Sequence, residues 1–289
     1  MPRRGVAALA CLAALVALAC DGAGSATPRP SRSATPQPSG SARPDGPAVM
    51  TALGDSITTG FGSCLVLVSC ERNSWSTGDS IRVRSHYRRL REQAPKLRAY
   101  DRATPGARAA GLAEQARTAV RDKADYVTVL IGANDACRAD VDAMTPVATF
   151  REQVDAGLRV LREGRPKARV LVVSIPDLYR LWELGHTEPR AVRAWSHGVC
   201  PALLADATST APAAVARRAR FRERIDAYDD QLRAACRAYG SRCRWDGGAA
   251  HRARFTLDDV NSLDWFHPAV AGQNQLAEAT WTAADWPTT

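Results

Sequence analysis

The chain has 289 residues, of which 45% are hydrophobic and 24% are charged, and its formal net charge is +9. This length suits one large domain or two small ones, and the composition allows an ordinary globular core. Residues 1–47 hold five arginines and two aspartates, which leaves a net charge of +6 for residues 48–289. The arginines are spread over several predicted helices and do not form a basic stripe with interleaved aromatic residues, which argues against a nucleic-acid-binding protein.

The N-terminus has the pattern of a secretory signal. Arg3 and Arg4 precede an apolar run over residues 6–19, which is too short to span a bilayer comfortably. We therefore interpret residues 1–20 as a signal peptide. Two alternatives stay open at Cys20, because residues 17–19 fit a signal-peptidase site while the cysteine after them resembles a bacterial lipobox. A lipidated Cys20 would tether the protein to a membrane, and it would leave six cysteines, an even number, to pair, so the cysteine count favours a lipoprotein.

The composition of residues 21–47 predicts an extended tether and not a folded element. They are Ser, Pro, Thr, Gly and Ala with scattered Arg, and they contain no Ile, Leu, Val or aromatic residue. Such a segment cannot bury enough apolar surface to fold and is stiffened by its prolines. We expect the folded domain to occupy residues 48–289.

Strand-like and helix-like stretches alternate from residue 48 onwards. Strands are predicted over residues 48–54, 97–103, 126–131, 169–175 and 243–245. Helices are predicted over residues 85–93, 109–123, 147–162, 215–239 and 269–281. This alternation predicts an α/β fold with a parallel sheet covered by helices on both faces. Residues 178–213 interrupt it, and we expect them to pass over one end of the sheet with a small helix near residues 191–197.

The first predicted strand leads into Gly54-Asp55-Ser56. A strand, a tight turn and a helix start would place the Ser56 hydroxyl near the positive end of the next helix. Gly78-Asp79-Ser80 repeats the three residues, but a polar stretch without a strand precedes it. The sequence therefore favours Ser56 as a nucleophile and Ser80 as a loop or helix-start serine, and we interpret Asp55 as a structural turn residue.

A serine hydroxyl needs a base to accept its proton, and the base needs a third group to hold it. The candidates for this base are the five histidines, His86, His186, His197, His251 and His267. Only His267 has a carboxylate, Asp264, three residues before it, which in a helix is one turn away on the same side. The alternative is that Asp264 and His267 merely cap the helix that follows.

These blocks, taken in order, resemble the SGNH, or GDSL, hydrolases over residues 48–289. Ser56 stands in the first block, Gly106 follows the second predicted strand, Asn134 follows the third, and Asp264 and His267 lie near the end. The resemblance implies a single domain with a flavodoxin-like, doubly wound, five-stranded α/β/α sandwich. Its strand order 2-1-3-4-5 would bring the first three blocks together at the switch point of the sheet.

The resemblance also implies a chemistry, namely cleavage of carboxylic esters through an acyl-enzyme on Ser56. His267 would be the base, Asp264 would stabilise the imidazolium, and the N–H groups of Ser56 and Gly106 with the Asn134 amide would form the oxyanion hole. No metal or cofactor is implied. We expect a monomer that acts on an ester of a lipid or of an acylated glycan. Two alternatives stay open, a carbohydrate O-acetylesterase at the cell surface and a catalytically inactive, surface-tethered binding protein.

Six cysteines follow Cys20, and an exported protein favours their pairing. We predict nearest-neighbour pairs, Cys64–Cys70, Cys137–Cys200 and Cys236–Cys243. A zinc site would need tighter clusters with histidine partners, so none is expected. The protein should be secreted or anchored at the cell surface.

Three tryptophans, Trp75, Trp182 and Trp195, lie in the irregular segments nearest the predicted site. They could line an acyl groove, stack on sugar rings, or simply pack inside the loops.

Overall fold

A computed structural model describes residues 46–284. The predicted signal peptide, Cys20 and almost all of the predicted tether lie outside the described residues. Within residues 46–284, no helix combines the length and the apolar character that crossing a bilayer requires.

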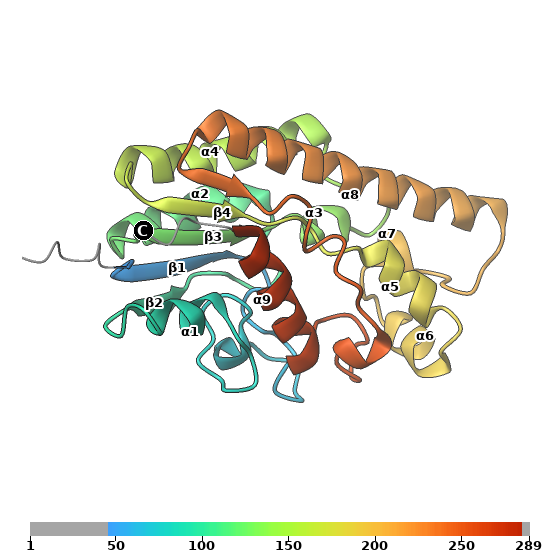
Figure 1. Ribbon diagram of the computed structural model, residues 1–289. Coiled ribbons are helices and arrows are strands. Elements are labelled where there is room, and N and C mark those ends of the chain that lie inside the picture. Colours follow the sequence, from blue (N-terminus) through green and yellow to red (C-terminus); the bar gives the residue numbers. More distant parts are fainter. Residues whose placement is uncertain (1–45, 285–289) are drawn as a thin grey trace, which may run out of the picture. The chain divides into compact units, whose positions relative to one another are not determined.

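The five predicted strands form one sheet, and every neighbouring pair in it is parallel (Figure 1). The strands are β1 (Val49–Gly54), β2 (Arg98–Asp101), β3 (Tyr126–Leu130), β4 (Arg169–Val172) and β5 (Cys243–Trp245). Their order is β2-β1-β3-β4-β5, so the predicted flavodoxin-like order is confirmed. Every residue of β1 and β3 is buried, which is why these two strands read as continuous apolar runs in the sequence.

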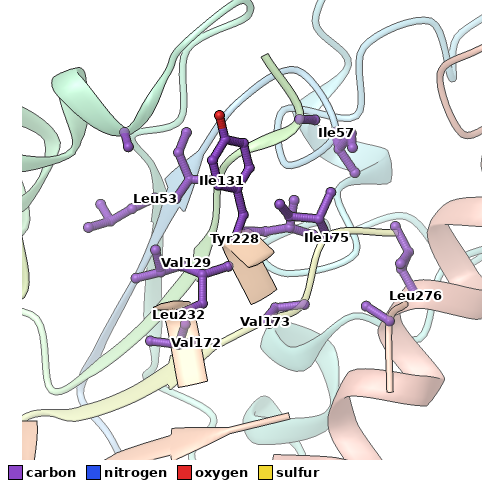
Figure 2. Close-up of a cluster of buried hydrophobic side chains, with 14 of the residues drawn as sticks. Leu53, Ile57, Val129, Ile131, Val172, Val173, Ile175, Tyr228, Leu232 and Leu276 are labelled. Atoms are coloured by element: carbon purple, nitrogen blue, oxygen red, sulfur yellow. The ribbon is translucent and has the colours of Figure 1, made fainter. Parts of the chain in front are cut away.

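Helices cover both faces of this sheet, as Figure 1 shows. One face carries α2 (Leu112–Arg121), α4 (Val147–Gly164) and α8 (Pro212–Tyr239), and the other carries α1 (His86–Arg91) and α9 (Val270–Ala284). Figure 2 shows the core between these layers, where Tyr228 and Leu232 of α8 approach the sheet from one side and Leu276 of α9 approaches from the other. The predicted α/β/α sandwich is therefore confirmed.

The excursion after β4 lies beyond the carboxyl ends of the strands, as predicted (Figure 1). It contains α5 (Leu178–Gly185), α6 (Pro189–Trp195) and α7 (Pro201–Leu204), of which the sequence predicted one small helix at the position of α6. The start of α5 is fixed by Asp177, whose side chain accepts a hydrogen bond from the N–H of Arg180. Periodicity missed α5 and α7, of which α7 has only four residues, too few turns to show a pattern.

Strands β2 and β4 are shorter than predicted. The expected fourth strand over residues 169–175 ends at Val172, because Ser174 and Ile175 leave the ladder. The Ser174 hydroxyl donates to the carboxylate of Asp246, and the N–H of Ile175 donates to that of Asp229. Side-chain acceptors from distant segments thus replace the next strand as hydrogen-bond partners.

The six cysteines of the domain form the three predicted disulfides, Cys64–Cys70, Cys137–Cys200 and Cys236–Cys243. The second ties the start of α7 to the short helix α3 (Ala133–Ala136), which follows β3 directly. It therefore anchors the excursion to the switch point of the sheet.

Candidate active site

The turn after β1 positions Ser56, and Gly54 is the residue that makes this turn fit. Gly54 has a φ of +152°, and a side chain there would collide with the carbonyl oxygen of Leu130 and the hydroxyl of Thr58. Gln115 of α2 brackets the same residue, since its Nε2 donates to the Gly54 carbonyl at 2.9 Å and its Oε1 accepts from the Gly54 N–H at 2.8 Å. The end of β1 is therefore locked before the chain reaches Ser56.

Ser56, His267 and Asp264 lie in one hydrogen-bonded line. The Nε2 atom of His267 lies 2.9 Å from the Oγ atom of Ser56, and its Nδ1 atom lies 2.7 Å from Oδ2 of Asp264. Ser56 and Asp264 are buried, whereas the imidazole between them is 16% exposed. This arrangement lets a proton pass from the serine hydroxyl to an imidazole that a buried carboxylate orients.

The prediction that one helical turn joins Asp264 and His267 is wrong. Residues 261–267 form successive turns ahead of α9, and Trp265 has a left-handed φ of 53°. Asp264 itself folds the segment, because its Oδ1 atom accepts from the N–H groups of Phe266 at 2.9 Å and His267 at 3.1 Å. Since α9 begins only at Val270, this pair does not cap it.

Asn261 holds the Asp264 carboxylate in place. Its Nδ2 atom donates to Oδ1 of Asp264 at 2.8 Å, while its own Oδ1 accepts from the N–H groups of Leu263 and Asp264. Burial alone would raise the pKa of Asp264, but the hydrogen bond and charge of His267 and the N–H donors of His267 and Phe266 outweigh it. The pKa of Asp264 therefore lies below its usual value, and the carboxylate is ionised at neutral pH.

Two aromatic rings enclose the imidazole. The ring centroid of Phe61 lies 4.7 Å from that of His267, and the ring of Phe266 meets it edge-on at 5.1 Å. Both rings pack against the imidazole, whose side chain is 16% exposed.

The predicted oxyanion donors lie on segments that are hydrogen-bonded to one another at the end of β1. Asn134, in α3, donates from Nδ2 to the carbonyl of Ala107 at 3.1 Å, which ties it to the loop that carries Gly106. That loop is joined to β1, since the N–H of Thr104 donates to the Gly54 carbonyl at 3.1 Å. Within residues 46–284, the N–H groups of Ser56 and Gly106 donate to no acceptor.

Asp55 is completely buried beside the serine. Its Oδ1 atom accepts from the N–H of Ile57 at 2.9 Å, and its Oδ2 atom has no hydrogen-bond partner among the described residues. Burial raises the pKa of Asp55 to about 7, against the opposing effects of the Ile57 hydrogen bond and the charge of His267. The hydrogen bond to Ile57 closes the turn that presents Ser56, which fits the predicted structural role.

The second Gly-Asp-Ser copy lies in a loop, as predicted. The Ser80 hydroxyl accepts from the N–H of Arg82 at 3.3 Å. In the described part of the chain, no imidazole lies within hydrogen-bond distance of Ser80.

The other histidines are engaged elsewhere. The ring of His86 lies between the hydroxyls of Tyr126 and Thr280, at 2.8 and 2.9 Å, and is fully buried. His186 contacts backbone carbonyls of its own helix, and His251 contacts the Ile175 carbonyl at 2.9 Å. His197 is exposed.

The tryptophans do not line an open groove. Trp75 and Trp195 are buried, and their indole N–H groups donate to the Thr58 hydroxyl and the Trp265 carbonyl. Trp182 is half-buried and donates to the Ala207 carbonyl. Packing inside the loops is therefore their role, and neither an acyl groove nor a sugar platform is built on Trp75 or Trp195.

Sequence reasoning missed the residues that hold the site together, namely Gln115, Asn261 and Gln273. Gln273 of α9 donates to the Ile57 carbonyl at 2.8 Å and accepts from the N–H of Trp75 at 2.9 Å. Gln115 and Gln273 could have been noticed as amides on the buried faces of their helices. Nothing in the sequence marks Asn261. Among residues 46–284, no group of three or more His, Cys, Asp or Glu side chains is arranged to hold a metal ion.

The chain is similar to known proteins. The family model described as "GDSL-like Lipase/Acylhydrolase family" matches residues 52–275. Phospholipase B1, membrane-associated, from Rattus norvegicus is 29% identical over 195 residues, which are 54% of this chain and only 13% of that protein.

Two solved structures show the same fold. A variant of the acetylxylan esterase from Geobacillus stearothermophilus is 16% identical, with 86% of this chain and 99% of that one covered and a TM-score of 0.51. The extracellular lipase from Streptomyces rimosus is 18% identical, with 82% and 99% covered and a TM-score of 0.50. With the family model matching residues 52–275, the chain belongs to the GDSL-like lipase/acylhydrolase family.

Proposed function

We propose that the protein cleaves its ester through an acyl-enzyme on Ser56, with His267 as the base and Asp264 as the orienting acid. The observation that carries the proposal is the line of contacts from Ser56 Oγ to His267 Nε2 at 2.9 Å and from His267 Nδ1 to Asp264 at 2.7 Å. Each group stands where proton transfer between serine and imidazole requires it.

In the first half of the reaction, Oγ of Ser56 bonds to the ester carbonyl carbon while its proton passes to Nε2 of His267. The imidazolium then faces the ionised Asp264, whose lowered pKa keeps it a carboxylate. The negative charge on the former carbonyl oxygen is met by the N–H groups of Ser56 and Gly106 and by the Asn134 amide. His267 returns its proton to the leaving alcohol, and the acyl group stays on Ser56.

In the second half, water takes the place of the alcohol. His267 accepts a proton from water as its oxygen attacks the acyl carbon, and then returns that proton to Ser56 as the carboxylic acid leaves. The cycle consumes one water per ester and needs no other reactant.

For the substrate, we propose an ester of a lipid or of an acylated glycan. The names of two relatives, a phospholipase B1 and an acetylxylan esterase, support these two classes. A series of p-nitrophenyl esters of increasing acyl length separates them. Turnover of acetate alone supports glycan deacetylation, and turnover of longer chains supports a lipid ester.

The competing proposal, an inactive binding protein on this scaffold, is tested by a serine-directed fluorophosphonate. We expect the probe to label the wild-type protein and Ser80→Ala but not Ser56→Ala. Ser56→Ala should lose activity by at least about 10⁴-fold with an unchanged melting temperature. Turnover retained in Ser56→Ala, or no labelling of the folded wild type, would overturn the assignment.

We further propose that the protein acts outside the cytoplasm, as a monomer that is secreted or anchored at the cell surface. Three disulfides support an oxidising compartment. Mass spectrometry of the mature protein would show whether the chain begins at a lipidated Cys20.

A further inference from the structure

The loop after Ser56 exposes a continuous run of aliphatic side chains. Leu65, Val66, Leu67 and Val68 are 82, 51, 46 and 54% exposed. A single exposed leucine is ordinary on a protein surface, but four consecutive exposed aliphatic residues are not. Residues 65–68, called the apolar tip below, therefore call for an apolar partner.

The apolar tip is held in place by its surroundings. The Cys64–Cys70 disulfide closes the loop at its base. Two backbone hydrogen bonds join this loop to the turn before it: the N–H of Gly62 donates to the Val68 carbonyl at 3.1 Å, and the N–H of Cys70 donates to the Thr59 carbonyl at 3.0 Å. The exposure of residues 65–68 is thus a property of a braced loop.

Gly62 connects the apolar tip to the active site. Its φ is +77°, and a Cβ atom there would lie 2.5 Å from Nδ2 of Asn261 and 3.7 Å from Cβ of His267. The backbone that binds Val68 therefore packs directly on the segment that carries the catalytic imidazole. Leu263, in that same segment, is 50% exposed. Figure 1 shows the blue loop after β1 projecting beyond the first turn of α9.

Basic residues stand beside the apolar tip. Arg72 follows the disulfide by two positions, and its carbonyl accepts from the N–H of Ser80 at 2.9 Å. This contact brings Ile81, which is 86% exposed, and the exposed Arg82 next to the base of the loop. Glu71 and Asp79 are exposed there too, but residues 71–88 carry four arginines, Arg72, Arg82, Arg84 and Arg88, against these two carboxylates. An aliphatic projection beside a segment with excess positive charge is the composition that binds an anionic lipid surface.

The shape of the apolar tip fits a lipid surface better than a single acyl chain or a second copy of the chain. Side chains that are about half or more exposed on a projecting loop do not enclose a single acyl chain, as the walls of a pocket would. Four side chains are also too small an area for a stable contact with a second copy of the chain. A fluid lipid surface, in contrast, deforms around a small projection.

We propose that the apolar tip docks the protein on anionic lipid bilayers by inserting residues 65–68 among the headgroups. The exposed surface alone supports docking. Docking would bring Ser56 to ester bonds at the lipid surface, and this second step rests on the proposed function. The substrate class would then be a lipid ester presented in a bilayer.

The test compares two valines of equal exposure. Val66 in the apolar tip is 51% exposed and Val215 on α8 is 50% exposed. Val66→Asp and Val215→Asp are made in the full chain carrying Cys20→Ser, so that no lipid on Cys20 can act as an anchor. Co-sedimentation with vesicles of phosphatidylcholine and phosphatidylglycerol is measured, together with hydrolysis of a soluble short-chain ester and of an ester embedded in the vesicles.

We expect Val66→Asp to weaken vesicle binding by about tenfold or more and to lower the ratio of embedded-ester to soluble-ester hydrolysis. Val215→Asp should bind and hydrolyse like the parent, and Ser56→Ala should bind like the parent. Vesicle binding through the apolar tip in a protein that hydrolyses neither ester would support the docking surface while overturning the proposed function.

Three results would overturn the docking surface. The parent protein could fail to bind vesicles, or the two aspartate variants could bind equally well. Alternatively, Val66→Asp could dissolve a dimer seen by size-exclusion chromatography and leave vesicle binding intact, which would make the apolar tip a subunit contact.

Discussion

The imidazole of His267 lies 2.9 Å from the hydroxyl of Ser56, although 211 positions separate the two residues in the chain. Gln273 of α9 maintains this approach, because it donates to the Ile57 carbonyl next to Ser56 at 2.8 Å. The helix that follows His267 is therefore joined to the turn that follows β1. The geometry of the site depends on this contact between the two ends of the domain.

Asn134 is predicted to donate to the oxyanion. Asn134→Ala should lower kcat by about 10²- to 10³-fold with little change in KM, because the interaction strengthens only as negative charge develops. Asn134→Asp has the same shape but no amide donor, so it should lose as much. Steady-state kinetics on a soluble ester provide the measurement, and wild-type kcat in Asn134→Asp would exclude this role.

Asn261 is predicted to act through Asp264. Asn261→Ala removes the 2.8 Å hydrogen bond to Oδ1 of Asp264, so kcat should fall by about 10- to 100-fold as the carboxylate loses its orientation. Asn274→Ala is the matched control, because that side chain accepts from the N–H of Arg84 and contacts none of the three residues.

The same substitution should change acid stability. The lowered pKa of Asp264 stabilises the fold above the ordinary carboxyl pKa of 3.8, and this contribution is lost as pH falls through the folded pKa. With one donor fewer, the pKa of Asp264 rises, so Asn261→Ala should begin acid unfolding at a higher pH than the wild type. Identical acid unfolding curves and an unchanged kcat would show that Asn261 has no such role.

The disulfides should differ in their contribution to stability. Cys137 and Cys200 are 63 positions apart, whereas Cys236 and Cys243 are seven apart. In the chain-entropy account, replacing the first pair by alanines costs about 4 kcal/mol and replacing the second costs about 2 kcal/mol. Urea unfolding of the two double variants measures the difference, and equal losses would mean that loop closure does not dominate here.

His86 should make the fold sensitive to mild acid. Burial lowers the pKa of His86 to about 3 from the ordinary 6.5, so its contribution to stability is full above pH 6.5 and is lost as pH falls towards 3. Between pH 7 and pH 4 the free energy of unfolding should drop by about 3 kcal/mol from this group alone. His86→Asn should remove that part of the slope in denaturant titrations at several pH values, while the exposed His197→Asn should not.

Local patterns account for much of what the sequence predicted. Buried apolar runs defined β1 and β3, and strand–helix alternation predicted the parallel sheet, whose strand order came from the resemblance to the SGNH hydrolases. Nearest-neighbour pairing of cysteines gave the three disulfides. The spacing of Asp264 and His267 identified the acid–imidazole pair, although turns and not a helix produce that spacing. The strands, the two short disulfide loops and the Asp264–His267 pair depend on residues close in sequence, where periodicity and chain reach limit the alternatives.

The tertiary structure decided which distant groups meet. It placed His267 on Ser56 and left Ser80 in a loop, although both serines stand in the same three-residue motif. It buried Trp75 and exposed the apolar tip at residues 65–68, although both lie in the same irregular segment. Gln115 and Asn261 brace the site through contacts that no periodicity records. Contacts of this kind are fixed only when helices and loops pack on the sheet, because packing, and not local sequence, determines which buried donors and acceptors face each other.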